Sequence, residues 1–545
     1  MDGERPYPGT SELGGSVGDP DSEVLYTTRR RNYEVGSDVE GDVAPVGWSF
    51  ILPTREPRAA VEIAPASTGS LAGLESAERA SLAGPEDLQS VGAGSYDLVD
   101  LGSVDAARLT DPADVAAGVA SALAPGGVVR GDVTWIPAMA TVGLVPTLRC
   151  WASPADDPVA LVPEQDETLI QRFRAAGRHR AGYAHVLGRG AAPEPKPGSI
   201  VLFGTDEHAQ GGGPPAWLAT VASNAGVDIS GYRWGVWARR NYSSQKAVFF
   251  LHLDDESPDA VVKVPRSSRF NERLENEAAA IERVRSIPAL EPTVPATLFS
   301  GWHGGLFVLG SQGIAGPSMP EVATGGPKCP VAGRVVEWVT QLAVETARPV
   351  PADDVAPALR EVVDRFVSLY RPAAEMVDFL ARQVDSVGSI SRAVPLVMMH
   401  GNVSNWNVIV PPDAPLVFVD WEFAEMTGPP LWDLFYFLRM DSWRPTRGWR
   451  RLVPPRRPRT DTFLESDGGV TADRIERYCE AVGVPPEAVV PLFHLCWVHL
   501  CLNEATHRTA TNLERATKLS VLKRAMALDA AGRLEPLLRS RQRLL

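Results

Sequence analysis

The sequence predicts an α/β unit followed by an α+β unit of two lobes. The chain has 545 residues, which is more than one domain usually contains. Before residue 130 short apolar segments alternate with glycine turns, whereas residues 247–311 hold apolar segments and one amphipathic stretch, and helical periodicity dominates after residue 355. These patterns place the first unit at residues 46–225 and the second at 226–545. Residues 1–45 are rich in Gly, Ser, Asp and Glu, which predicts a flexible lead-in.

Three segments of the first unit follow a known order. Residues 60–69 (AVEIAPASTG) read as a strand that ends in a turn, residues 96–100 (YDLVD) as a second strand, and residues 123–129 (LAPGGVV) as a turn from a helix into a strand. This order resembles a Rossmann-like methyltransferase. Ala64 and Ala66 replace the glycines that let a cofactor approach the backbone. The resemblance therefore implies a reduced methyltransferase-like domain, in which binding of S-adenosylmethionine is not expected.

A lysine and a glutamate near the start of the second unit are predicted to form an ion pair. Residues 260–264 (AVVKV) read as a strand that carries Lys263, and residues 271–285 (NERLENEAAAIERVR) read as an amphipathic helix that carries Glu277. A lysine that binds nucleotide phosphates needs a carboxylate to hold it, and this spacing suits such a pair. The chain has six lysines against forty-seven arginines, so a lysine here stands out. The alternative is a surface ion pair of little energetic value.

Four polar residues between positions 400 and 420 are spaced for phosphoryl transfer. His400, Asn402 and Asn407 lie in the run HGNVSNWN, and Asp420 follows the apolar segment 416–419. Phosphoryl transfer needs metal ions that bridge phosphate oxygens, so a carboxylate and an amide must project from neighbouring strand ends into one cleft. Asp420 is therefore expected to be the main metal ligand and Asn407 the second. Asn402 is expected to face the attacking hydroxyl, and His400 to tie this loop to the metal-binding segment.

These positions resemble the H-G-D-x-x-x-x-N and D-W-E motifs of the aminoglycoside phosphotransferase and choline kinase-like family. The resemblance implies a two-lobed kinase-like domain at 226–545 that uses ATP and Mg²⁺, with Asp433 bracing the catalytic loop. Asn402 departs from the pattern, because the family has an aspartate there that accepts or orients the proton of the substrate hydroxyl. A general base contributes about 10² to 10⁴ in rate, whereas positioning and electrostatics supply most of the catalysis. A slow kinase and an inactive relative both remain open.

The kinase-like reading assigns two further segments. Residues 247–253 (AVFFLHL) read as a strand, and the preceding residues 241–246 (NYSSQK) are the candidate loop over the phosphates. Ser243 and Ser244 are candidate phosphate contacts there, as serines are in some relatives. Residues 305–311 (GLFVLGS) resemble the last strand of the small lobe, which leads to the hinge that would bind adenine.

Two groups of residues are expected to be structural. On a helix, the side chains of the first group would not converge on one ion, and the surrounding run is apolar, so a buried helix is favoured over a metal site. This group consists of His494, Cys496, His499 and Cys501. The second group is expected to pack around the floor of the cleft rather than to bind substrate. It consists of Trp406, Trp421 and Trp432.

Composition sets outer limits on partners and location. The net charge of -14 argues against a general nucleic-acid surface, which leaves small molecules or other proteins as partners. The five cysteines lack CxxC spacing, the N-terminus does not resemble a signal peptide, and the apolar runs are too short or interrupted to predict a membrane span. A cytoplasmic protein is therefore expected.

The resemblance predicts ATP- and Mg²⁺-dependent phosphorylation of a small-molecule hydroxyl, on a sugar or a glycosylated metabolite. Residues 261–266 (VVKVPR) and 419–424 (VDWEFA) also look like phosphotransferase-like proteins associated with bacterial surface-polysaccharide synthesis. The competing hypothesis is a non-catalytic, nucleotide-binding pseudokinase or scaffold. Asn402 favours this second hypothesis, whereas the pair Lys263 and Glu277 favours nucleotide binding in either case.

Overall fold

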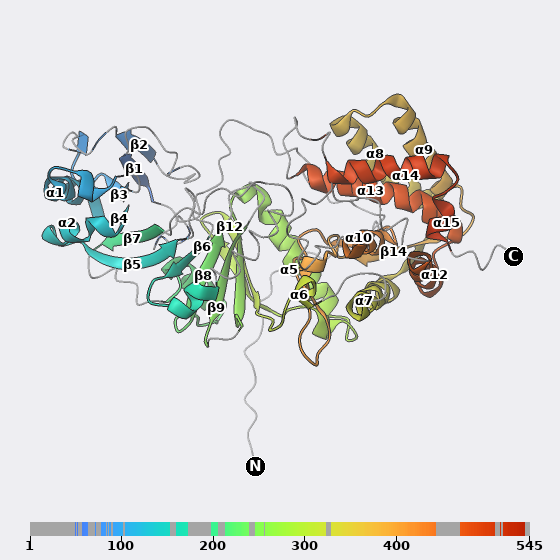
Figure 1. Ribbon diagram of the computed structural model, residues 1–545, viewed down its shortest axis with the longest axis horizontal. Coiled ribbons are helices and arrows are strands. Elements are labelled where there is room, and N and C mark those ends of the chain that lie inside the picture. The colour runs from blue at the N-terminus through green and yellow to red at the C-terminus, as the bar shows by residue number, and fades with distance from the viewer. Residues whose placement is uncertain are drawn as a thin grey trace, which may run out of the picture.

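The computed structural model arranges the chain as an N-terminal unit, a small lobe and a helical lobe, from left to right in Figure 1. One sheet of twelve strands runs through the first two. The described residues are 50, 52, 57–63, 71, 78–82, 84, 87–88, 91–101, 104–152, 160–172, 198–204, 213–238, 246–254, 257–322, 329–442, 469–506, 513 and 516–539.

The N-terminal unit contains the parallel part of the sheet. Its strands in spatial order are β2 (Glu78–Leu82), β1 (Ala59–Ile63), β3 (Tyr96–Asp100), β4 (Leu123–Gly131), β7 (Gly198–Gly204), β5 (Val145–Ala152) and β6 (Ala160–Pro163). The first four are parallel, and the remaining neighbours pair antiparallel. A crossover helix, α1 (Pro112–Ala122), joins β3 to β4, and α2 (Ile136–Thr141) follows. This unit is therefore an α/β structure, as the sequence predicts.

Local sequence explains how these parallel strands begin. The Asp111 side chain accepts hydrogen bonds from two backbone N–H groups at the start of α1 and caps the helix. The Asp97 carboxylate accepts the N–H groups of Arg58 and Ala59, so it anchors the start of β1 against β3. The LAPGG segment differs from the expected turn, because α1 ends at Ala122 and β4 already begins at Leu123, with an irregularity in its pairing to β3.

The small lobe continues the same sheet with antiparallel strands. These are β8 (Arg233–Ala238), β9 (Lys246–His252), β10 (Ala260–Pro265), β12 (Leu306–Gln312) and β11 (Thr297–His303), in spatial order. The join lies between β6 and β8, where Leu161 pairs with Val236. The sheet thus crosses the boundary expected at residue 225. Apolar side chains of both units, such as Leu202 and Phe249, also belong to one buried cluster.

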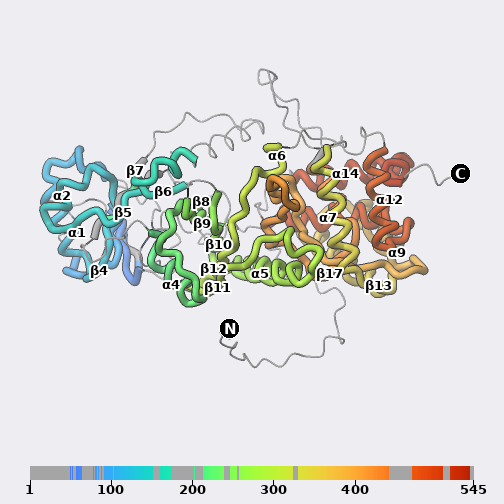
Figure 2. Tube along the Cα trace, turned by 90° about the horizontal axis from the view of Figure 1, so that it is seen from below, coloured from blue at the N-terminus to red at the C-terminus, as the bar shows by residue number. Residues whose placement is uncertain are grey.

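Two helices pack against the small-lobe strands. Helix α5 (Asn271–Arg285) has the bounds that its amphipathic pattern predicts, and it lies between the sheet and the helical lobe (Figure 2). Its Leu274 packs with Phe307 and Leu309 of β12. Helix α4 (Ala216–Asn224) precedes residue 225 but packs on β11. The small lobe therefore includes residues on both sides of the expected boundary.

The helical lobe surrounds one buried helix, α13 (Val489–Ala505). The remaining helices are α6 (Met319–Val322), α7 (Pro330–Thr346), α8 (Ala352–Tyr370), α9 (Ala374–Gly388), α10 (Trp432–Ser442), α12 (Val470–Val482), α14 (Thr517–Ala530) and α15 (Glu535–Leu538). Short strands complete it: β13 (Arg348–Val350), β14 (Val394–Met399), β15 (Val408–Ile409), β16 (Val417–Phe418) and β17 (Glu425–Gly428). In the described residues, one segment, Pro486–Ala505, is long and apolar enough to cross a membrane, but 89% of its most apolar window is buried inside the protein.

Helix α13 also contains the four histidines and cysteines singled out above. All four are buried in the core. His494 Nε2 lies 3.2 Å from an Asp529 carboxylate oxygen, and the Cys496 thiol faces the Trp432 carbonyl. These contacts belong to the packing of α13 against its neighbours.

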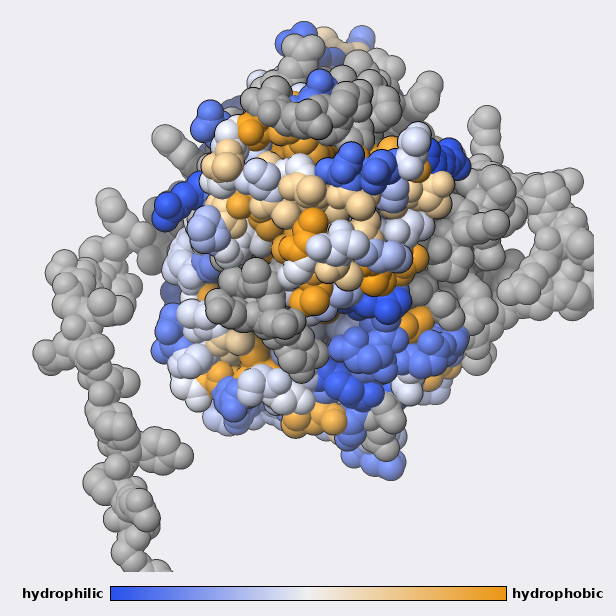
Figure 3. Space-filling model, turned by 90° about the vertical axis from the view of Figure 1, so that its left-hand side faces the viewer, coloured by the Kyte–Doolittle hydropathy of each residue, from blue (hydrophilic) through white to orange (hydrophobic). Residues whose placement is uncertain are grey.

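At the opposite end of the molecule, polar and apolar residues are interspersed on the face that Figure 3 presents.

Candidate active site

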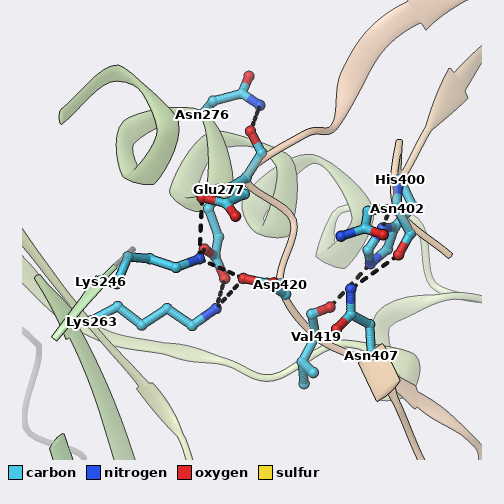
Figure 4. A network of polar contacts seen from close by, with 10 residues as sticks. Lys246, Lys263, Asn276, Glu277, His400, Asn402, Asn407, Val419 and Asp420 are labelled. Carbon is cyan, nitrogen blue, oxygen red and sulfur yellow. Dashed lines mark hydrogen bonds and ion pairs between the residues drawn. The ribbon is translucent and has the colours of Figure 1, made fainter. Parts of the chain in front are cut away.

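Three chain segments meet where the small lobe faces the helical lobe. The loop at 400–402 follows β14, Asn407 directly precedes β15, and Asp420 follows β16. Strands β15 and β16 pair with each other, and the Val419 N–H donates to the Asn407 carbonyl at 3.0 Å. The pairing brings the expected metal ligands onto neighbouring strand ends. Figure 4 shows them together with the lysines of β9 and β10.

His400 connects the loop to the segment that carries Asp420. Its ring is fully buried, with Nε2 3.2 Å from the Val419 carbonyl oxygen and Nδ1 3.3 Å from the Asn402 backbone nitrogen. These partners assign the proton to Nε2, because Nδ1 must accept. Burial lowers the pKa of His400 to about 4, so the ring is neutral at physiological pH. The imidazole thus has the structural place that the sequence predicts.

Asp433 holds the backbone of the same loop. Its two carboxylate oxygens accept the N–H groups of His400 at 2.6 Å and Gly401 at 2.9 Å. Burial raises the pKa of Asp433 to about 7, although the two N–H groups favour the ionised form. Gly401 has a φ of +76°, and a Cβ at this position would lie 2.0 Å from the Phe423 carbonyl oxygen. The turn therefore needs glycine both for its conformation and for the close approach of the next segment.

We expect Gly401→Ala to lower thermal stability by several degrees, because a left-handed alanine costs about 1 kcal/mol and the Cβ clash adds to it. Gly483→Ala is the matched control: Gly483 has a φ of +83° in the same lobe, but nothing lies within 4 Å of its added Cβ. Differential scanning calorimetry of both variants separates the two contributions. Equal losses of melting temperature would show that the approach of Phe423 does not constrain this turn.

Lys263 and Glu277 form the expected ion pair. The Lys263 Nζ lies 2.5 Å from Glu277 Oε1 and 3.2 Å from Asp420 Oδ1. The Glu277 side chain is 2% exposed and that of Lys263 is 14% exposed. The two side chains therefore do not form a solvent-exposed surface pair, which was the alternative. Instead, the lysine links the small lobe to the segment that carries Asp420.

Lys246 was missed by the sequence reasoning as a member of this cluster. It is the first residue of β9, and its Nζ lies 2.5 Å from Asp420 Oδ1, 3.2 Å from Glu422 Oε2 and 3.9 Å from Glu277 Oε2. Burial disfavours the charged ammonium, but these carboxylates outweigh it and hold the pKa of Lys246 well above its ordinary value. The scarcity of lysine in the chain was the one signal that could have found it.

Asp420 stands at the centre of the cluster in an unusual backbone conformation. Its φ is +72°, in the left-handed region that few residues other than glycine adopt. Burial would raise the pKa of its carboxyl, but the ammonium groups of Lys246 and Lys263 outweigh burial and hold that pKa far below its usual range. The carboxylate is thus ionised at physiological pH, with both lysines bound to Oδ1.

Asn402 and Asn407 lie beside each other across from Asp420 (Figure 4). The Asn407 side-chain nitrogen donates to the Asn402 backbone carbonyl at 3.0 Å, which fixes the orientation of the Asn407 amide. Among the described residues, the Asn407 amide oxygen and the Asn402 side-chain amide have no hydrogen-bond partner. The structure therefore brings together Asn402, Asn407 and Asp420, as the sequence predicts.

A second connection that the sequence did not reveal joins α5 to the segment that follows Asp420. The buried Asn276 donates from its side-chain nitrogen to the carbonyls of Glu422 at 3.3 Å and Ala424 at 2.9 Å. The Arg273 guanidinium lies 5.1 Å from the centre of the Phe423 ring. Asn276 is the neighbour of Glu277 on α5. These hydrogen bonds therefore connect the helix that carries Glu277 directly to the segment that carries Asp420.

The remaining residues that the sequence assigns to the site differ in where the structure places them. Ser243 and Ser244 lie outside the described residues. Trp421 and Trp432 are buried, whereas the Trp406 side chain is 39% exposed. Within the described ranges, no group of three or more His, Cys, Asp or Glu side chains is arranged to hold a metal ion.

Comparisons with known proteins agree with the kinase-like reading of the second unit. Residues 239–456 match the family model described as the phosphotransferase enzyme family. No curated protein matches the chain.

Solved structures resemble the same part of the chain at low identity. A GDP complex of a mutant aminoglycoside 2'-phosphotransferase is 14% identical, with 53% of this chain and 90% of that chain covered and a TM-score of 0.34. A choline/ethanolamine kinase family protein from Mesorhizobium loti is 17% identical, with 54% and 89% covered and a TM-score of 0.33. An aminoglycoside phosphotransferase from Streptomyces rimosus is 16% identical, with 53% and 97% covered and a TM-score of 0.32.

Proposed function

We propose that the chain is a phosphotransferase that uses ATP and Mg²⁺ to phosphorylate the hydroxyl group of a small molecule. The observation that carries this proposal is the convergence of Lys263, Glu277 and Asp420 in one partly buried cluster. The cluster lies inside the segment that matches the phosphotransferase family. A sugar or a glycosylated metabolite is the acceptor that we favour, in a cytoplasmic setting where ATP and magnesium are available.

The residues present fit a magnesium ion. Mg²⁺ prefers oxygen ligands and is usually held by one or two protein groups together with substrate phosphates and water. Asp420 offers Oδ2, because both lysines contact Oδ1, and Asn407 offers its amide oxygen, because its nitrogen is bound to Asn402. When bound, the metal would supply positive charge that offsets the negative charge developing during transfer.

The chain's own residues would position the reactants. Lys263, held by Glu277, would bind the nucleotide phosphates. Asn402 would donate a hydrogen bond to the acceptor hydroxyl or accept one from it and so orient the oxygen. His400 and Asp433 would keep the loop that carries Asn402 in place, because neither can leave its buried hydrogen bonds without leaving a polar group unpaired.

Lys263→Met and Glu277→Gln are each expected to weaken ATP binding by about tenfold to a hundredfold, and the double variant by little more than either alone, because both changes disrupt one coupled unit. Isothermal titration calorimetry with ATP and Mg²⁺ measures the four affinities. Additive losses in this double-mutant cycle would mean that the two side chains act on the nucleotide independently.

The competing proposal is a nucleotide-binding protein without transfer activity. Asn402 favours it, because an amide cannot accept a proton at neutral pH. Titration of ATP with and without Mg²⁺, followed by a hydrolysis assay, distinguishes the cases. An empty site binds nothing, a binding-only site binds without turnover, and a phosphotransferase shows slow hydrolysis of ATP. Absence of ATP binding under both conditions would overturn both proposals.

For the N-terminal unit we propose a reduced methyltransferase-like domain that does not bind S-adenosylmethionine. The order of parallel strands with a crossover helix between β3 and β4 supports a Rossmann-like unit. The turn after β1, where a cofactor would approach the backbone, lies outside the described residues. The alanines in that turn are the reason for not expecting the cofactor.

A further inference from the structure

The ammonium group of Lys246 occupies a cation position on the expected metal ligand. It lies 2.5 Å from Asp420 Oδ1 and 3.2 Å from Glu422 Oε2, and both carboxylates belong to the metal-binding segment. Lys263 differs, because its shorter contact is to Glu277 of α5 and Asp420 is its second partner. Both lysines thus reach Asp420, but the shortest contact of Lys246 is to the segment after β16, whereas that of Lys263 is to the small lobe.

The formal charges of the cluster show what this lysine changes. The carboxylates of Glu277, Asp420 and Glu422 surround the two ammonium groups. Three negative and two positive formal charges give a sum of minus one. Without Lys246 the same residues would sum to minus two, which one divalent cation would neutralise. The ammonium thus supplies part of the positive charge that a metal ion would otherwise supply.

We infer, on the premise that the site takes a nucleotide as proposed above, that Lys246 is a tethered cation that competes with the divalent metal for Asp420. In the nucleotide-free protein the ammonium holds Asp420 and keeps metal affinity low. Nucleotide phosphates offer the ammonium a new anionic partner, and its departure removes a competing positive charge from Asp420, whose Oδ2 can then hold the metal more tightly. Metal and nucleotide then strengthen each other's binding, and linkage requires the effect to be reciprocal.

The position of Lys246 suits this exchange. Its side chain is 13% exposed and Asp420 is 28% exposed, so the contact lies close to where phosphates would enter. Lys246 also ends the run 241–246, which the sequence predicts to cover the phosphates. A lysine with four rotatable bonds can move its ammonium by several ångströms without movement of the backbone.

Lys246→Met is expected to tighten Mn²⁺ binding to the nucleotide-free protein at least tenfold, measured by electron paramagnetic resonance of free Mn²⁺. The same variant should lose most of the enhancement that ADP gives to Mn²⁺ binding. Lys523→Met is the matched control, because Lys523 is exposed on α14 and its removal changes the net charge equally. Lys246→Arg keeps the charge and should retain the weak affinity of the natural protein.

Unchanged Mn²⁺ affinity in folded Lys246→Met would overturn the inference, as would equal tightening in Lys523→Met. If the methionine variant does not fold, Lys246→Gln removes the charge but keeps a hydrogen-bond donor for Asp420, and the same tightening is expected. The nucleotide-free titration does not depend on ATP binding. Failure of the proposed function would appear separately, as a lack of ADP binding to the natural protein.

Discussion

Asp420→Asn is expected to remove the magnesium-dependent part of nucleotide binding, a loss of roughly 10²-fold or more. The amide keeps the size of the side chain but removes the charge, and a unit charge about 4 Å from a cation contributes on the order of 4 kcal/mol at an effective dielectric constant near 20. Asparagine tolerates the left-handed conformation at this position better than alanine does. The fold should therefore survive, and calorimetric titration of ATP with and without Mg²⁺ measures the effect.

Asp413→Asn is the matched control for this experiment. Asp413 also has a positive φ, of +57°, and is exposed on the loop between β15 and β16. The change of charge and the backbone conformation are thus the same, but the residue lies outside the cluster. Retention of the magnesium-dependent affinity in Asp420→Asn, with the fold intact, would remove Asp420 from the role of main metal ligand.

Asn402→Asp is expected to raise phosphotransfer or ATP hydrolysis, by up to about 10² to 10⁴. The new carboxylate would accept the proton that the acceptor hydroxyl loses, at the position where the side chain lies beside Asn407 and across from Asp420. The gain is smaller if the natural amide already orients the hydroxyl. Steady-state assays of ADP release measure the change in turnover.

The double variant Asn402→Asp, Asp420→Asn provides the control, because it keeps the new carboxylate but lacks the metal ligand. It should show no gain. If Asn402→Asp alone binds ATP and Mg²⁺ normally but turns over no faster than the natural chain, the nucleotide-binding scaffold becomes the preferred function.

Local patterns predicted the parts of the site whose geometry is set by short segments. The bounds of α5 follow from apolar residues at helical spacing, such as Leu274 and Ile281. The places of His400 and Asp433 were implied by the family resemblance, and the structure shows the hydrogen bonds that each of them makes there. These features lie within one segment or belong to a recognised motif, so the sequence alone indicates them.

Contacts across long sequence separations were not predictable in the same way. Lys246 was read as the end of a loop, and only the pairing of β9 in the sheet directs its side chain toward Asp420, which is 174 residues away. The pairing of β6 with β8 likewise has no local signal, because any two short apolar strands can pair. The close contact of Gly401 with Phe423 became evident only once both segments were placed.

The uninterrupted sheet gives the N-terminal unit a mechanical role in any motion of the small lobe. Strands β6 and β8 pair directly, through Ala160 with Trp237 and Leu161 with Val236. From β8 to β2 the sheet spans seven strand spacings of about 4.8 Å, or roughly 30 Å. Each degree by which the small lobe tilts about β8 therefore sweeps the far edge through roughly half an ångström. If the small lobe moves against the helical lobe when the proposed nucleotide binds, the N-terminal unit would move with it as a lever arm.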